Sequence, residues 1–140
     1  MSSEPKTRPT GASVEAFIEA VEPRGRREDA RAVCAMLAEI SGEAPEMWGP
    51  GIVGFGRYRY TGSNGKPAEW PRIGFSPRKA NMVLYLMPGF QEQEALLQRL
   101  GPHKTGVSCL YLGRLADVDG QALRQMAERS WAEMARRYPA

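Results

Sequence analysis

The 140-residue sequence has few of the residues from which metal-binding and catalytic sites are most often built. It contains a single histidine, His103, so any site that needs two histidines is excluded. Its only cysteines, Cys34 and Cys109, lie far apart and lack the paired spacing of a zinc site. We therefore expect two reduced, buried thiols rather than a disulfide or a pair of metal ligands.

Long apolar runs are also missing. No stretch reaches the roughly 18 consecutive apolar residues of a membrane-spanning helix. The N-terminal segment MSSEPKTRPTG is polar and has no apolar centre, which is unlike a secretory signal. We expect a cytoplasmic protein with no membrane contact, in which residues 1–11 form a flexible tail and residues 12–140 a single domain.

The charge is small in total and uneven along the chain. Of a net charge of +3, residues 57–104 contribute +5, from eight Lys or Arg against three Glu, so the remainder carries −2. No helix or loop in this region carries a dense basic run, which favours an ordinary solvated face. Anion or nucleic-acid binding by the basic region is kept as an alternative.

Four segments have the apolar spacing of amphipathic helices. The first follows a possible cap at Ser13, and the second ends at Gly42, the usual residue at a helix C-terminus. A short third helix is expected to start at Phe90. The fourth has the cleanest apolar stripe and follows a cap at Asp117 or Asp119.

Four strands are predicted from alternating or short apolar runs, at residues 52–60, 70–76, 82–87 and 107–115. Asn64-Gly65 is a strong hairpin signal between the first two. The predicted order is ααβββαβα. The sequence therefore predicts an α+β protein with an antiparallel four-stranded sheet, residues 82–87 as the central strand, and helices packed mainly on one face.

One face of this sheet, called here the low face, is expected to have a depression where side chains are missing. Gly54, Gly56 and Gly74 have no side chains to fill it, so a bulky side chain or a ligand should lie against them. Trp48 belongs to a connector, residues 43–51, that is rich in Pro and Gly. Its indole is expected either to cover the edge of the core or to stack on a ligand.

These features favour a non-enzymatic binding protein whose ligand is a small molecule, a metal such as iron, or a protein partner. The candidate ligand-binding residues are Trp48, Tyr58, Trp70, Arg72, His103 and Lys104. Trp48, Tyr58, Trp70 and Lys104 are expected to line one pocket. No catalytic residue is predicted, the cofactor is left open, and both a monomer and a homodimer are compatible with the sequence.

Two alternatives remain open. An enzyme would use His103 with Ser108 or Cys109, and would need the histidine within hydrogen-bond reach of one of them. Single-stranded nucleic acid could stack on the Tyr and Arg residues of the strands. This surface lacks the strand signatures of known RNA-binding modules, so nucleic acid is not the favoured partner.

Five stretches together resemble the YdhG-like family, also called the domain of unknown function 1801 family. They are VEAFIEAV, the Trp48-Gly49 loop with GIVGFGRYRY, WPRIGFSPRKANMVLYLMPGF, LGPHKTGVSCLYLGRLADVD and the final helix. The resemblance covers nearly the whole chain after residue 11. It implies a small cytosolic bacterial α+β domain with an antiparallel sheet. Some relatives look like intracellular iron chaperones with a frataxin-like role, and the family implies no catalytic residues.

Overall fold

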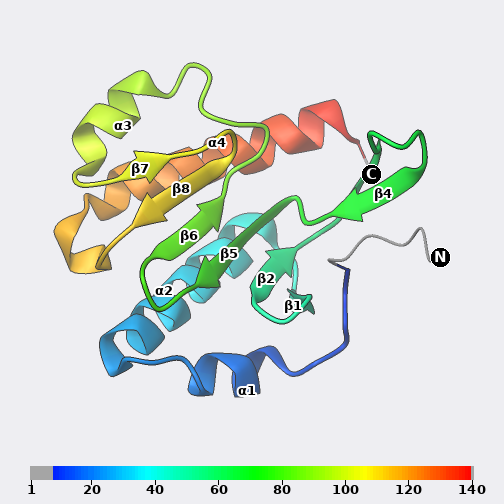
Figure 1. The fold of residues 1–140 in the computed structure, drawn as a ribbon. Helices are drawn as coiled ribbons and strands as arrows, with labels where there is room; N and C mark the ends of the chain where they lie inside the picture. The colour runs from blue at the N-terminus through cyan, green and yellow to red at the C-terminus, as the bar shows by residue number, and fades with distance from the viewer. Residues whose placement is uncertain (1–7, 140) are drawn as a thin grey trace.

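The computed structural model describes residues 8–139, which form an α+β fold (Figure 1). The helices of this part are α1 (Val14–Glu19), α2 (Arg24–Ser41), α3 (Glu94–Leu100) and α4 (Gly120–Arg137), with a 3-10 turn η1 (Leu115–Asp117). The strands are β1 (Pro45–Trp48), β2 (Ile52–Phe55), β3 (Tyr58–Thr61), β4 (Pro67–Trp70), β5 (Ile73–Pro77), β6 (Met82–Tyr85), β7 (Lys104–Thr105) and β8 (Cys109–Leu112). Six of these strands form one antiparallel sheet in the order β1-β2-β5-β6-β8-β7, and β3 pairs with β4 in a separate hairpin.

The α+β class is confirmed, but the predicted four-stranded sheet is wrong. The predicted strand 52–60 breaks at Gly56, whose φ of 68° turns the chain out of the sheet. The predicted strand 70–76 breaks at Pro71, which has no N–H for the ladder. The two pieces released by these breaks, β3 and β4, form the hairpin that leaves the sheet on the right of Figure 1.

Both edge strands of the sheet were missed. The connector 43–51 contains β1, which pairs with β2 from Pro45↔Phe55 to Trp48↔Ile52. The two-residue β7 adds the other edge beside β8. Because of Pro45, the first of these strands was not predicted from the sequence. Proline usually indicates that a segment is not a strand, but it is tolerated at the start of an edge strand.

The predicted helix ends are confirmed where a specific side chain or glycine sets them. The Ser13 hydroxyl accepts a hydrogen bond from the Ala16 N–H at 3.1 Å and starts α1. Gly42 ends α2 with a φ of 68° and donates to the Ala38 carbonyl. Asp119, rather than Asp117, caps α4 by accepting from Gln121 and Ala122.

The core lies between one face of the sheet and the helices. Phe55, Phe75, Leu84 and Leu110 belong to this face and are fully buried, and they form one cluster with residues from all four described helices. The opposite face carries a second, smaller cluster built on Val83, Tyr85, Met87 and Met134. Side chains of the β3–β4 hairpin and of the C-terminal end of α4 cover part of this second face.

Residues just before α1 lie along the outer edge of β1. Thr10 donates to the Met47 carbonyl at 3.0 Å, and Gly49 donates to the Arg8 carbonyl at 2.9 Å. Pro9 and Trp48 form an antiparallel bridge between these two bonds. The expected tail therefore overlaps an ordered pairing at residues 8–10, whereas residues 1–7 lie outside the described residues. None of the helices within residues 8–139 has the length and apolar character needed to cross a membrane.

Candidate functional site

A groove of about 770 Å³ lies between the loop after β6 and the C-terminal half of α4. We call it the arginine groove. It is lined by Pro88, Gly89, Gln91, Glu92, Gln93, Arg129, Ser130, Ala132, Glu133, Arg136 and Arg137. Its volume falls in the range of about 300–1,000 Å³ that is typical of small-molecule sites.

The loop wall of the arginine groove needs special backbone conformations. Gly89 has a φ of 146°, and a Cβ there would lie 2.8 Å from the Val107 carbonyl oxygen. Glu92 has a φ of 63°, a left-handed conformation that costs a side-chain-bearing residue about 1–2 kcal/mol. Strain of this kind is found most often at functional loops.

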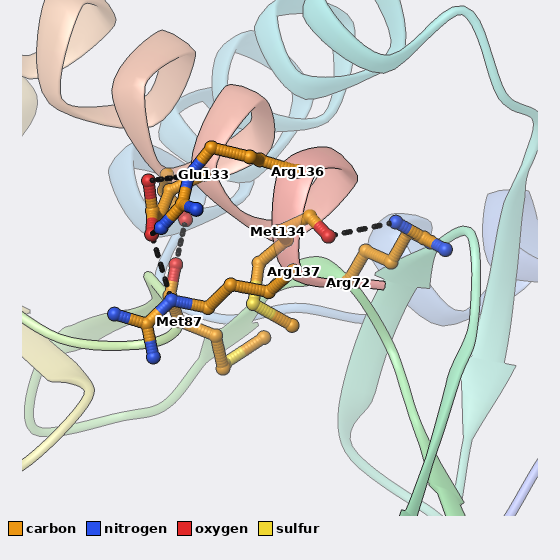
Figure 2. Close-up of polar contacts among 7 residues, drawn as sticks. Arg72, Met87, Glu133, Met134, Arg136 and Arg137 are labelled. Carbon is orange, nitrogen blue, oxygen red and sulfur yellow. Dashed lines mark hydrogen bonds and ion pairs between the residues drawn. The ribbon is translucent and has the colours of Figure 1, made fainter. Parts of the chain in front are cut away.

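A buried hydrogen bond ties the loop to α4. The Ser130 hydroxyl donates to the Met87 carbonyl at 2.7 Å, and Ser130 is only 1% exposed. Figure 2 shows this bond beneath the charged side chains of the helix. The two walls of the groove are therefore held at a fixed separation where Met87 meets Ser130.

Charged side chains converge on the helix wall (Figure 2). The Glu133 carboxylate accepts from both Arg136 and Arg137, with Arg136 Nε at 3.0 Å and Arg137 Nε at 2.7 Å. Hydrogen bonds from Arg136 and then from Arg137 lower the pKa of Glu133 to about 2. Glu133 therefore stays ionised at any physiological pH and acts as an internal anion for these two guanidinium groups.

The arginines are not fully occupied by Glu133. Within the described residues, the two terminal nitrogens of Arg137 make no hydrogen bond, and 48% of its side chain is exposed. Arg129 donates from one terminal nitrogen to the Glu92 carbonyl at the long distance of 3.4 Å. Three arginines face two glutamates in the lining, which leaves a formal charge of +1 and several free donors.

After Ser130, Gln93 is the most deeply buried polar side chain of the lining. It is 5% exposed, and its Oε1 atom is buried without a hydrogen-bond partner among the described residues. A buried acceptor without a partner costs about 1–3 kcal/mol, so native structures retain few of them. The neighbouring Gln91 carboxamide lies over Gly89, since a Cβ on that glycine would be 3.2 Å from Gln91 Oε1.

Three predicted site residues come together elsewhere, on the second face of the sheet. Trp48 is fully buried, with its ring 6.2 Å from that of Trp70, and Trp70 meets Tyr85 edge to face at 5.9 Å. Tyr58 is the register partner of Trp70 and lies 4.7 Å from Tyr138. Burial first, and then the neighbouring tyrosines, raise the pKa of Tyr58 to about 12.

This aromatic cluster, Trp48, Tyr58, Trp70, Tyr85 and Tyr138, lies on the low face and covers it at Gly54. A Cβ on Gly54 would lie 2.6 Å from the Trp48 ring and 2.6 Å from Pro71. The bulky group against Gly54 is therefore a side chain of the chain itself, whereas Gly56 lies against Trp131 and Arg72 and a Cβ on Gly74 would meet the Val53 carbonyl oxygen. Trp48 lies at the end of an edge strand and not in a loop, with its Nε1 buried and without a partner among the described residues.

Arg72 binds main-chain carbonyls. Its Nε donates to the Arg57 carbonyl at 2.9 Å, and its terminal nitrogens donate to the carbonyls of Met134, at 3.2 Å, and Tyr138. Figure 2 shows the bond to Met134 at the end of α4. The side chain thus joins the β3–β4 hairpin to the last turn of the helix.

His103 and Lys104 do not reach the other predicted site residues. Lys104 belongs to β7 at one edge of the sheet, while Trp48 belongs to β1 at the opposite edge. The pocket expected from Trp48, Tyr58, Trp70 and Lys104 is therefore not formed as a single site. His103 Nδ1 lies 2.7 Å from the Gly101 carbonyl, two residues away.

His103, Ser108 and Cys109, the residues of the enzyme alternative, each contact a different part of the chain. The Ser108 hydroxyl donates to the Pro88 carbonyl at 3.2 Å, and no hydrogen bond joins His103 to Ser108 or Cys109 within the described residues. Cys109 instead lies beside Tyr111, and the hydrogen bond between these two side chains raises the pKa of Tyr111. Across residues 8–139, no group of three or more His, Cys, Asp or Glu side chains is placed to hold a metal ion.

The arginine groove is not predicted from the sequence. In the sequence, Arg136 and Arg137 stand at the end of the fourth predicted helix, where positive charge is favourable for the helix dipole alone. The available signal was the spacing of Arg129, Glu133, Arg136 and Arg137, which at i, i+4, i+7 and i+8 share one side of α4 beside its apolar stripe. That side faces the loop that carries the two glutamines.

Comparisons of this chain with protein-family models, with curated proteins and with solved structures find no match.

Proposed function

We propose that this protein is a non-enzymatic binding domain and that its ligand is a small molecule with a phosphate or carboxylate group, held in the arginine groove. The observation that carries the proposal is the pair Arg136 and Arg137, already arranged around a carboxylate, that of Glu133. Guanidinium groups recognise such oxyanions through parallel N–H donors. Membership of the YdhG-like family remains part of the proposal, supported by the sequence stretches that resemble it.

A simpler interpretation is that the three charges only stabilise the helix. Arginines near a helix C-terminus and i, i+4 ion pairs each contribute a few tenths of a kcal/mol at an exposed surface. Such pairs occur on α2 as well, where Arg24 and Glu28 are 3.3 Å apart. The α4 group differs because it lines a groove whose other wall carries a strained loop and a buried carboxamide oxygen that has no partner within residues 8–139.

Calorimetric titration with inorganic phosphate tests the proposal. Arg136→Ala combined with Arg137→Ala should weaken phosphate binding at least about tenfold, because both guanidinium groups that donate hydrogen bonds to the phosphate are lost. Arg24→Ala is the matched control, since it removes an equally charged arginine from an i, i+4 pair on another helix. It should leave the affinity unchanged.

Glu133→Gln separates a binding role from a stabilising one. If Glu133 competes with the ligand for the two arginines, its neutral variant should bind phosphate more tightly than the parent protein. If the charges serve only the helix, the variant loses a little stability and gains no affinity. Absence of phosphate binding in both the parent and Glu133→Gln would refute the proposed function.

A further inference from the structure

The loop wall of the arginine groove has features that an anion alone does not explain. The Gln91 and Gln93 carboxamides lie on this wall, opposite the arginines of α4. Inorganic phosphate at Arg136 and Arg137 would occupy a small part of about 770 Å³. It would direct its oxygens at the arginine N–H donors and would leave the glutamine side chains of the other wall without a ligand partner.

The chemistry of the two walls defines a ligand with two kinds of group. The arginines offer only N–H donors and require an anion. A carboxamide offers an acceptor and a donor side by side, and a hydroxyl both donates and accepts. Neighbouring hydroxyl groups therefore match a glutamine side chain, and they satisfy Gln93 whichever way its oxygen and nitrogen are placed.

We propose that the arginine groove binds a sugar phosphate, with the phosphate at Arg136 and Arg137 and the sugar hydroxyls at Gln91 and Gln93. This inference rests on the proposed function and adds the class of ligand. A hexose or pentose phosphate suits a groove of this volume. The free terminal nitrogens of Arg137 and the two glutamine side chains that line the opposite wall supply the two ends of the contact.

Four titrations of the full chain test the inference, with glucose 6-phosphate, ribose 5-phosphate, inorganic phosphate and glucose. At least one sugar phosphate should bind about tenfold or more tightly than phosphate, and glucose alone should bind far more weakly than either. Gln93→Met keeps the size and apolar stem of the side chain but removes the amide. It should reduce sugar phosphate affinity to that of phosphate while leaving phosphate binding unchanged.

Gln98→Ala, at an exposed position on α3, is the control for Gln93→Met and should change neither affinity. Thermal melts of both variants check that the fold is kept, and Gln91→Ala offers a second test at an exposed site. Equal affinities for phosphate and both sugar phosphates would overturn this inference and leave the anion site standing. Loss of binding for all of them would overturn both proposals.

Discussion

Replacing Gly54 by alanine should destabilise the fold strongly, although it adds a single methyl group. The new Cβ would lie 2.6 Å from the Trp48 ring and 2.6 Å from the Pro71 Cβ, where ordinary contacts are 3.4–4 Å. Each neighbour would have to move by about 0.8 Å, the difference between these distances. Trp48 is fully buried and the Pro71 ring is part of the main chain, so neither can move freely.

Overpacking of this kind costs about 1–3 kcal/mol, and two rigid neighbours place Gly54→Ala near the upper value. An entropy of unfolding of about 2.1 cal/mol/K per residue gives about 0.3 kcal/mol/K for this chain. A loss of about 3 kcal/mol therefore lowers the melting temperature by about 10 °C. Differential scanning calorimetry and urea unfolding measure the two quantities independently.

Gly113→Ala is the matched control. A Cβ at Gly113 meets no atom within 4 Å, and its φ lies outside the left-handed region. This substitution should leave stability unchanged or raise it by up to about 1 kcal/mol, since alanine restricts the unfolded chain. If Gly54→Ala proved as stable as Gly113→Ala, the close packing of Trp48 on the glycine face would be refuted.

Three further results are expected from contacts that do not involve the arginines of the groove. Arg72→Ala removes three hydrogen bonds to main-chain carbonyls and should lower the free energy of unfolding, measured in urea, by about 2 kcal/mol. The control Arg59→Ala, at an exposed position, should lower it by less than about 0.5 kcal/mol. Equal losses would contradict the role given to Arg72. Ser130→Ala leaves the Met87 carbonyl without its hydrogen-bond donor and should lower the free energy of unfolding in urea by about 1–3 kcal/mol. An unchanged urea midpoint would contradict this expectation. Stability should fall as the pH rises from 10 to about 12, because the raised pKa keeps Tyr58 protonated in the folded chain while the unfolded chain loses that proton. Tyr58→Phe should make this decline shallower, and phenolate absorbance should show the last tyrosine titrating only in the parent protein.

The parts of the fold that follow from local chemistry could be predicted from the sequence. Ser13, Gly42 and Asp119 set helix ends through their own hydrogen bonds or backbone freedom, and the Asn64-Gly65 turn closes the β3–β4 hairpin. The number of strands could not be predicted in this way. Gly56 and Pro71 lie inside runs that look continuous, and only the packing of the second face decides that the chain leaves the sheet there.

The candidate site was harder to predict for a similar reason. Trp48, Tyr58 and Trp70 were expected to line one pocket, and in the structure Trp70 lies beside the Trp48 ring and pairs with Tyr58 across the hairpin. Lys104 was grouped with them because its edge strand was unknown. The arginine groove joins α4 to a loop about forty residues earlier, and the pattern within either segment does not indicate that pairing.

The pairing of residues 8–10 with β1 bears on how the molecule avoids sticking to copies of itself. An open strand edge offers unpaired N–H and C=O groups to any other extended chain, which is how fibrous aggregates begin. Here the Met47 carbonyl and the Gly49 N–H are already taken by Thr10 and Arg8, and Pro9 adds no donor of its own. At the far edge, the ladder ends in the two residues of β7. A shortened chain that starts at Ala12 would keep its core but would expose the unpaired edge of β1, to which other chains could pair. Its solubility on storage should therefore fall before its thermal stability does.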